Sequence, residues 1–302
     1  MTTIGFVGLG SMGSAMVGRL LDEGFDVVVW NRSRDAVPPL VERGARAAAD
    51  VGEVLATGRV LSVLAHDAAF RAVFTPEVLA AAPAGCVHAN MATVSVAAAG
   101  EFAAAHAAAG VGYVAAPVIG RPPVAAAGKL NIVVAGADDA RSSLEDALEA
   151  LAGRVWPMGS DPSAANTAKI GVNYLIIHAL QAMAESLTLV ERSGIDPSAF
   201  VELANNSLFP GPVYGGYGAA IAESRYLPAG FTTTLGLKDL GLARQAAAAV
   251  DVELPTAGVL DEVFTEAVAA GADLDWAAVA EVTRRRAAGA ATEATTQQGS
   301  KP

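Results

Sequence analysis

The chain has 302 residues, a formal net charge of −11 and a hydrophobic fraction of 53%. This length favours two domains over one, and the acidity argues against nucleic acid or an anionic membrane surface as the main partner. The apolar residues are largely alanine interrupted by charges, so we expect no membrane span, and the single cysteine, Cys86, excludes an intrachain disulfide.

The first 33 residues predict a phosphate-binding β-α-β unit. A buried strand at residues 4–7 is followed by Gly8-Leu9-Gly10-Ser11-Met12-Gly13, a helical pattern and a second strand at residues 26–30. In order, the three glycines permit the tight turn, let the backbone approach a pyrophosphate and let the helix pack closely on the strand. Because the amides of the helix's first turn then face the phosphates, residues 8–13 are the expected cofactor-binding loop.

The residues after the second strand decide between NAD and NADP in such folds. An acidic side chain there would accept from the ribose hydroxyls and repel a 2′-phosphate. This chain has Asn31, Arg32 and Ser33 instead. Because a guanidinium with neighbouring amide and hydroxyl donors suits a phosphate dianion, we predict NADP (NADPH) as the cofactor. The alternative is that Arg32 and Arg34 are only solvated surface charges.

The alternation of strands and helices continues for about half of the chain and then stops. Further strands are expected at residues 60–64, 85–89, 112–117 and 130–136, with an alanine-rich helix at 96–109. After residue 159 the pattern is only helical, with a long helix at 164–192 and others at 198–205, 235–250, 255–270 and 276–286. We therefore predict an α/β Rossmann domain at residues 1–160, joined by a long interdomain helix to an all-α domain at 161–287, and a disordered tail at 288–302. Because a core strand begins the chain in place of a cleavable leader, we expect the protein in the cytoplasm.

The long helix carries a second pair of candidate residues. Lys169 and Asn173 are four residues apart, so both project from the same face, about one turn from each other. An amine and a carboxamide so placed can hold one small oxygen-bearing group. Alone the pair is weak evidence, because exposed helices contain many lysines, but its place in the chain strengthens it.

Five motifs occur in a fixed order along the chain. They are Gly8-Leu9-Gly10-Ser11-Met12-Gly13-Ser14-Ala15-Met16, Asn31-Arg32-Ser33, Ala116-Pro117-Val118, Lys169-Ile170-Gly171-Val172-Asn173 and Lys238-Asp239-Leu240-Gly241-Leu242-Ala243. Together they resemble the β-hydroxyacid dehydrogenase family, which includes 3-hydroxyisobutyrate dehydrogenases and glyoxylate/succinic semialdehyde reductases. The resemblance extends to about Arg286.

This resemblance implies an NADP-dependent oxidoreductase that transfers a hydride between nicotinamide and a small hydroxy acid, aldehyde or related carbonyl compound. It makes Lys169 the catalytic acid/base and Asn173 the residue that orients the lysine or the substrate. It implies that Thr93 touches substrate or nicotinamide, that Lys238 reaches the cofactor and that Phe231 packs near the nicotinamide. It also implies an active site between the domains and a homodimer built by the helical domains.

The chain departs from the family in the segment that normally helps to hold a substrate carboxylate. Ile119 stands where the family usually has a serine, and Arg121 stands where it has a glycine. Arg121 either binds a carboxylate in a new way or lies on the surface. The candidate substrate contacts are Thr93, Ile119, Gly120, Arg121 and Tyr214. Leu64, which ends the predicted strand at residues 60–64, is added to the expected cofactor contacts.

Two alternatives to a dehydrogenase remain open. The segment Val29-Trp30-Asn31-Arg32-Ser33 also resembles imine reductases, in which the position of Lys169 usually carries aspartate or tyrosine. The second alternative is an NADP-binding scaffold or sensor without catalysis, for which loss of the lysine would be the signature. No metal site is expected, because the four histidines lack ligand spacing and the chain has one cysteine.

Overall fold

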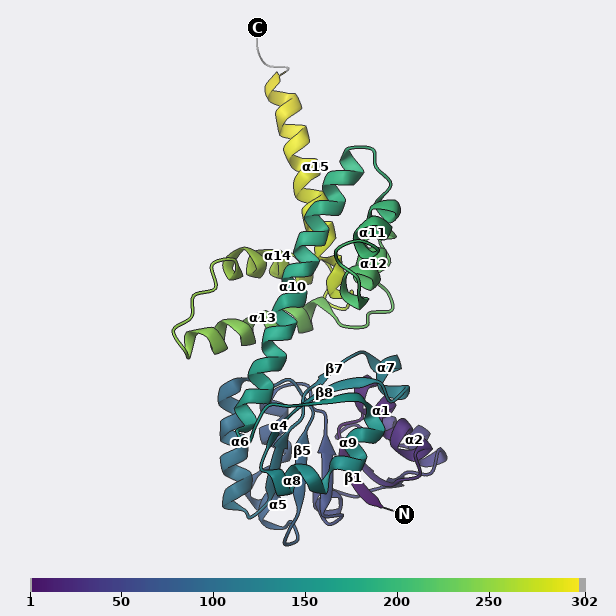
Figure 1. Ribbon diagram of the computed structural model, residues 1–302, viewed down its shortest axis with the longest axis vertical. Helices are drawn as coiled ribbons and strands as arrows, with labels where there is room; N and C mark the ends of the chain where they lie inside the picture. The colour runs from purple at the N-terminus through teal and green to yellow at the C-terminus, as the bar shows by residue number, and fades with distance from the viewer. Residues whose placement is uncertain (1, 299–302) are drawn as a thin grey trace. The chain divides into compact units, whose positions relative to one another are not determined.

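The computed structural model describes residues 2–298 and divides into two compact units, Met1–Ile170 and Gly171–Pro302 (Figure 1). We call them the Rossmann unit and the helical unit. Their division falls inside one long helix, α10 (Pro162–Arg192), whereas the sequence places the boundary at residue 160. The helix is shared because Ala165 belongs to the core of the Rossmann unit and Ile177 to that of the helical unit.

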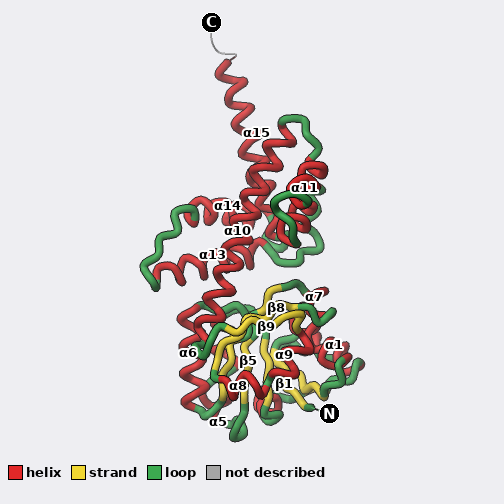
Figure 2. Tube along the Cα trace, viewed as in Figure 1, coloured by secondary structure: helices red, strands yellow, loops and turns green. Residues whose placement is uncertain are grey.

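The Rossmann unit is built on one sheet. Its strands are β1 (Thr3–Val7), β2 (Asp26–Trp30), β3 (Arg46–Ala47), β4 (Arg59–Ser62), β5 (Val87–Asn90), β6 (Gly112–Ala115), β7 (Val118–Ile119), β8 (Leu130–Gly136) and β9 (Ala152–Pro157). Within the described residues their order is β3-β2-β1-β4-β5-β6-β8-β7, with β9 paired to β8. Figure 2 shows the strands of this unit in yellow. β1 to β6 pair in parallel, and β8 runs antiparallel to β6 and β7. The order reverses between β1 and β4, and the carboxyl ends of strands at such a switch point are where dinucleotides bind in α/β sheets.

Helices cover both faces of this sheet. They are α1 (Ser11–Asp22), η1 (Arg34–Ala36), α2 (Pro38–Glu42), α3 (Val51–Leu55), α4 (Asp67–Val73), α5 (Pro76–Ala80), α6 (Val96–Ala108), α7 (Pro122–Ala126), α8 (Asp138–Ser143) and α9 (Glu145–Leu151). Val27 and Val29 of β2 enter the hydrophobic cluster that contains residues of α1 and α9, while Val28 enters the cluster that contains residues of α3, α4 and α6. Because successive strand residues point to opposite faces, this alternation produces a doubly covered sheet. The predicted α/β Rossmann fold is confirmed.

The strand predictions differ from the structure in two ways. The strands expected at 60–64, 85–89 and 112–117 are Arg59–Ser62, Val87–Asn90 and Gly112–Ala115. The apolar pattern of the sequence does not predict β3, β7 and β9. β3 and β7 have two residues each, too few to show a period, and most of β9 is exposed, so it lacks the apolar run of a buried strand.

The helical unit follows as predicted. It contains most of α10, then α11 (Pro197–Asn205), the π-helical turn η2 (Val213–Tyr217), α12 (Gly218–Ala222), α13 (Thr233–Ala248), α14 (Ala257–Ala270), η3 (Trp276–Ala278) and α15 (Val279–Gln298). Its core is one hydrophobic cluster that includes Leu180, Phe264 and Trp276. No helix within residues 2–298 has the length and apolarity needed to cross a membrane.

Residues 288–302 are expected from the sequence to be a disordered tail, but most of this segment is helical. Helix α15 continues to Gln298, and residues 299–302 lie outside the described residues. The segment 288–298 mixes good helix formers, four alanines with Glu293, Gln297 and Gln298, with poor ones, Gly289 and three threonines. It extends a helix that has already begun at Val279, so it needs no new nucleation.

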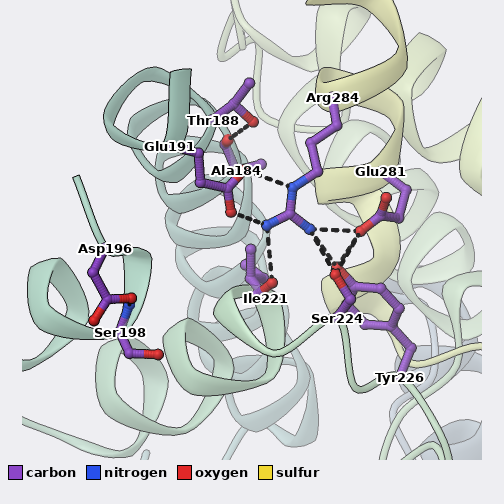
Figure 3. A network of polar contacts seen from close by, with 10 residues as sticks. All are labelled: Ala184, Thr188, Glu191, Asp196, Ser198, Ile221, Ser224, Tyr226, Glu281 and Arg284. Atoms are coloured by element: carbon purple, nitrogen blue, oxygen red, sulfur yellow. Dashed lines mark hydrogen bonds and ion pairs between the residues drawn. The ribbon is translucent and has the colours of Figure 1, made fainter. Parts of the chain in front are cut away.

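A charged network fastens three elements of the helical unit to one another (Figure 3). The Arg284 guanidinium of α15 donates to Glu191 of α10, to Glu281 one turn away and to the carbonyl of Ile221 in α12. The Tyr226 hydroxyl donates to the same Glu281 carboxylate at 2.7 Å. Both carboxylates and the phenol hold the pKa of Arg284 above its ordinary value, so this cation stays charged inside the helical unit.

Candidate active site

The glycine loop after β1 leaves no room for a side chain at two of its three glycines. Gly8 has φ +96°, and a Cβ there would lie 2.2 Å from the carbonyl oxygen of Val63. A Cβ on Gly13 would lie 1.9 Å from the carbonyl oxygen of Gly8, so the helix packs directly on the loop. Nothing lies within 4 Å of the corresponding position on Gly10. The protein itself therefore has no packing reason for glycine there, whereas a pyrophosphate approaching α1 would need that space.

Asn31 ties this loop to the end of β2. The backbone N–H of Leu9 donates to Asn31 Oδ1 at 3.0 Å, and Asn31 Nδ2 donates to the carbonyl of Ser33 at 2.8 Å. The Asn31 carboxamide thus holds the glycine loop and the Ser33 turn together. Leu64 also lies at the loop, because a Cβ on Gly8 would come within 3.0 Å of Leu64 Cδ2.

The two arginines after β2 differ in their surroundings. Arg34 donates to the carbonyls of Ala48 and Ala49, at 2.9 and 2.7 Å, so its guanidinium braces the segment after β3. Arg32 and Arg34 are both exposed, so the two carbonyl contacts of Arg34 are what distinguishes them. Arg32 is therefore the cation of the two that a phosphate group near the end of β2 could engage.

The loop after β5, residues 91–95, contains Thr93 and is fastened by side chains from three elements. Asn90 Oδ1 accepts from the Ala92 N–H at 3.1 Å. Asp67, at the start of α4, accepts from the Ser95 N–H at 3.2 Å and from its hydroxyl at 2.6 Å. Asn166 of α10 accepts from the Val94 N–H at 3.3 Å. The first turns of α10 thus lie against the Thr93 loop, which is within the Rossmann unit.

Lys169 follows one turn after Asn166 on α10 and is 8% exposed. Residues three apart on a helix are neighbours on its surface, so the lysine is held near the part of the helix that binds the Thr93 loop. Lysine is rarely buried this deeply in a folded protein, because burying an ammonium group costs free energy. Asn173, one turn further along, belongs to the helical unit.

In the helical unit the structure brings Asn173 together with Lys238 through a residue whose role the sequence analysis misses. Asn173 Nδ2 donates to Asp239 Oδ2, and Lys238 Nζ lies 3.2 Å from Asp239 Oδ1. Asp239 is 2% exposed. Asp239 directly follows Lys238 in the motif Lys238-Asp239-Leu240-Gly241-Leu242-Ala243. This neighbour could have indicated the role of Asp239, because a buried carboxylate requires a cation or donor close by.

Other predicted residues have identifiable neighbours within their own units. In the helical unit the ring centroids of Phe231 and Trp276 lie 4.5 Å apart, and those of Tyr214 and Phe209 lie 4.8 Å apart. In the Rossmann unit, Ile119 packs partly against the core, Gly120 has φ +150°, and Arg121 is half-buried directly before α7. The described residues hold no group of three histidine, cysteine, aspartate or glutamate side chains placed to bind a metal.

The sheet order and the glycine loop define a dinucleotide-binding α/β fold. Residues 3–159 match the family described as the NAD-binding domain of 6-phosphogluconate dehydrogenase, and residues 163–283 match the one described as NAD-binding of NADP-dependent 3-hydroxyisobutyrate dehydrogenase. An uncharacterized oxidoreductase of Bacillus subtilis, YfjR, is 37% identical over 281 residues, which cover 91% of this chain and 98% of the relative. Glyoxylate/succinic semialdehyde reductase 1 of Arabidopsis thaliana is 30% identical over 93% of this chain and 98% of its own.

Solved structures agree with these relatives. The 3-hydroxyisobutyrate dehydrogenase of Mycobacterium tuberculosis, solved with L-serine, is 28% identical, with a TM-score of 0.86 over 94% of this chain and 99% of its own. An imine reductase from Pseudomonas sp. is more distant, at 23% identity and a TM-score of 0.62, which shows a common fold alone. The chain belongs to the β-hydroxyacid dehydrogenase family and is an NAD(P)-dependent dehydrogenase.

Proposed function

We propose that this chain uses NADPH to reduce a small aldehyde or related carbonyl compound to its alcohol, or NADP to oxidise the corresponding alcohol, which is a hydroxy acid when the substrate carries a carboxylate, with Lys169 as the acid/base. The observation that carries the proposal is the burial of Lys169 one turn after Asn166, whose side chain binds the Thr93 loop. A titratable amine held at that position, buried beside the Thr93 loop, supports a role in proton transfer, because lysines are rarely buried and buried titratable groups gather at functional sites.

The chemistry assigns one task to each side chain. A bound nicotinamide dinucleotide supplies or accepts the hydride. In reduction, Lys169 donates a proton to the substrate oxygen as negative charge develops there, and in oxidation its neutral amine removes that proton. Asp239 holds the Asn173 carboxamide and the Lys238 ammonium, so it fixes two side chains that the family resemblance places at the site.

The preference for NADP rests on the end of β2. Asn31 and Arg34 are engaged by the protein's own backbone, and the exposed Arg32 remains as the cation for a 2′-phosphate. The three residues that directly follow β2 are Asn31, Arg32 and Ser33. None of them is acidic, so none supplies a carboxylate that would accept from the ribose hydroxyls of NAD. The match to a family described as NADP-dependent supports the same cofactor.

The first experiment measures NADPH consumption against a panel of small semialdehydes and keto acids. The wild type and Lys169→Ala are compared, with NADPH affinity of each determined separately. We expect turnover of carbonyls that falls by about 10²- to 10⁴-fold in the variant, the contribution typical of a general acid, with nearly unchanged NADPH affinity. Substantial turnover by Lys169→Ala would remove the lysine from this role.

Imine reduction is the second candidate, and Ile119 favours it. An apolar residue replaces the serine that the family uses near the substrate carboxylate, which suits a hydrophobic substrate better than an acid. The same assay with cyclic imines decides between the two. Turnover of imines alone would replace the first proposal, and binding of NADPH without any turnover would favour a scaffold or sensor.

We further infer that the helical unit forms a homodimer. Leu175 and Leu189 of α10 are 70% and 68% exposed, and about four turns of helix separate them, so both lie on nearly the same side. Large apolar side chains exposed along one helix are typical of a surface that another chain covers.

A further inference from the structure

Asn166 is a buried side chain that couples two parts of the Rossmann unit. It is 1% exposed, and its Oδ1 accepts from the Val94 N–H at 3.3 Å. We propose that Asn166 is a positioning residue, which holds the turn of α10 that carries Lys169 at a fixed distance from the Thr93 loop. This inference rests on the proposed role of Lys169.

The other contacts of the loop show what Asn166 adds. Asn90 extends β5 and Asp67 begins α4, so their bonds to Ala92 and Ser95 hold the loop to the sheet and to its neighbouring helix. The main chain joins the loop to the sheet as well, because the Met91 N–H donates to the carbonyl of Ser62 at 2.8 Å. None of these bonds involves α10, whereas the Asn166 bond does.

The chemistry of the contact requires an acceptor at position 166. The Val94 N–H points at a buried oxygen, and an amide N–H buried without a partner costs free energy. An apolar side chain of the same size would leave that donor without its acceptor, so the loop and the helix would separate enough to admit water. A shift of this kind changes the direction in which Lys169 points, because the two residues lie on neighbouring turns of one rigid helix.

Catalysis is more sensitive to such a shift than cofactor binding, because the glycine loop and the end of β2, which lie outside the Thr93 loop, hold the phosphates of the dinucleotide in the proposed function. A displacement of about 1 Å can lower a rate by about 10²-fold. The glycine loop is fastened by Asn31 to the end of β2 and does not depend on Asn166 in any contact described above. Loss of the Asn166 acceptor is therefore expected to lower kcat and to leave NADPH affinity as it is.

The test compares Asn166→Leu, which keeps the size and removes the acceptor, with Asn166→Asp, which keeps an oxygen there. Thr167→Val is the matched control, because Thr167 is the next residue on the helix and is exposed. We expect Asn166→Leu to lower kcat by about 10- to 100-fold with an NADPH Kd within about twofold of the wild type. Asn166→Asp is expected to restore most of kcat, and amide hydrogen exchange at residues 91–95 is expected to quicken only in Asn166→Leu.

Several results would overturn the inference. Wild-type kcat in Asn166→Leu, alongside an inactive Lys169→Ala, would contradict the positioning role while leaving the proposed function intact. Equal losses of kcat and NADPH affinity, or no recovery in Asn166→Asp, would mean that Asn166 serves stability alone. If Lys169→Ala retains turnover, the proposed function fails, and the positioning role that acts through the lysine fails with it. Should Asn166→Leu not fold, Asn166→Ser is measured in the same way.

Discussion

Neighbouring polar residues after β2 have different tasks, although the sequence presents them as one anion-binding group. Asn31 is engaged with the Leu9 N–H and the Ser33 carbonyl, and Arg34 is engaged with two backbone carbonyls. Arg32 is exposed. This difference makes Arg32 the residue on which the cofactor preference should depend.

Arg32→Ala should therefore weaken NADPH binding while it spares NADH binding. A hydrogen bond to a charged group is worth about 1.5–3 kcal/mol, so we expect the Kd for NADPH to rise by roughly 10- to 100-fold and that for NADH to change little. Equilibrium binding of the two dinucleotides, followed by fluorescence titration, measures this. Arg34→Ala is the matched control, and its ratio of NADPH to NADH affinity should stay at the wild-type value. Equal losses for both cofactors in Arg32→Ala would contradict the 2′-phosphate assignment.

At the scale of elements, a buried histidine pair joins β4, β5 and α6. His106 Nδ1 donates to the carbonyl of Phe102 at 2.7 Å, so its Nε2 is the acceptor for His88 Nδ1–H at 2.9 Å. His88 Nε2 then accepts from the Ser62 hydroxyl at 2.8 Å. Both rings are neutral in this arrangement. The spacing of the histidines in the sequence, which lacks the pattern of a metal site, does not predict that His88 and His106 meet.

This pair predicts a loss of stability in acid. Burial lowers the pKa of His106 to about 4 and that of His88 well below 6.5, so the unfolded chain binds protons between pH 6.5 and 4 that the folded chain does not. The contribution of the neutral pair to the free energy of unfolding is therefore fully present above pH 6.5, and it decreases as the pH falls toward 4. For His106 alone the loss is roughly 3 kcal/mol, at 1.36 kcal/mol for each pKa unit.

Urea unfolding at pH 7, 5.5 and 4.5 measures the loss. His106→Gln removes one titrating group and should give a smaller decrease in the free energy of unfolding over this range, even if it is less stable than the wild type at pH 7. An unchanged pH dependence in His106→Gln would assign the acid sensitivity to other groups.

The whole molecule offers a test of the proposed homodimer. Leu175→Glu places a charge on the side of α10 that exposes Leu175 and Leu189, and a charge buried at an interface without a partner opposes association. We expect light scattering after size-exclusion chromatography to report twice the chain mass for the wild type and a shift toward a single chain for Leu175→Glu. Glu202→Gln, at an exposed position of α11, is the control and should keep the wild-type mass. A wild-type protein that is monomeric would remove the dimer from the proposal.

The sequence by itself determined the fold class, the glycine loop and the position of the long helix. These features are local: the period of the apolar residues and the spacing of Gly8, Gly10 and Gly13 are complete within short segments. Short or exposed strands such as β9 carry no such period and were missed. Only the tertiary structure showed that Asn166 meets Val94, that Asp239 joins Asn173 to Lys238 and that His88 meets His106. Asn166 and Val94 are 72 residues apart, Asn173 and Asp239 are 66 apart, and His88 and His106 are 18 apart. A buried polar side chain pairs with the group nearest to it in space, which no local pattern encodes.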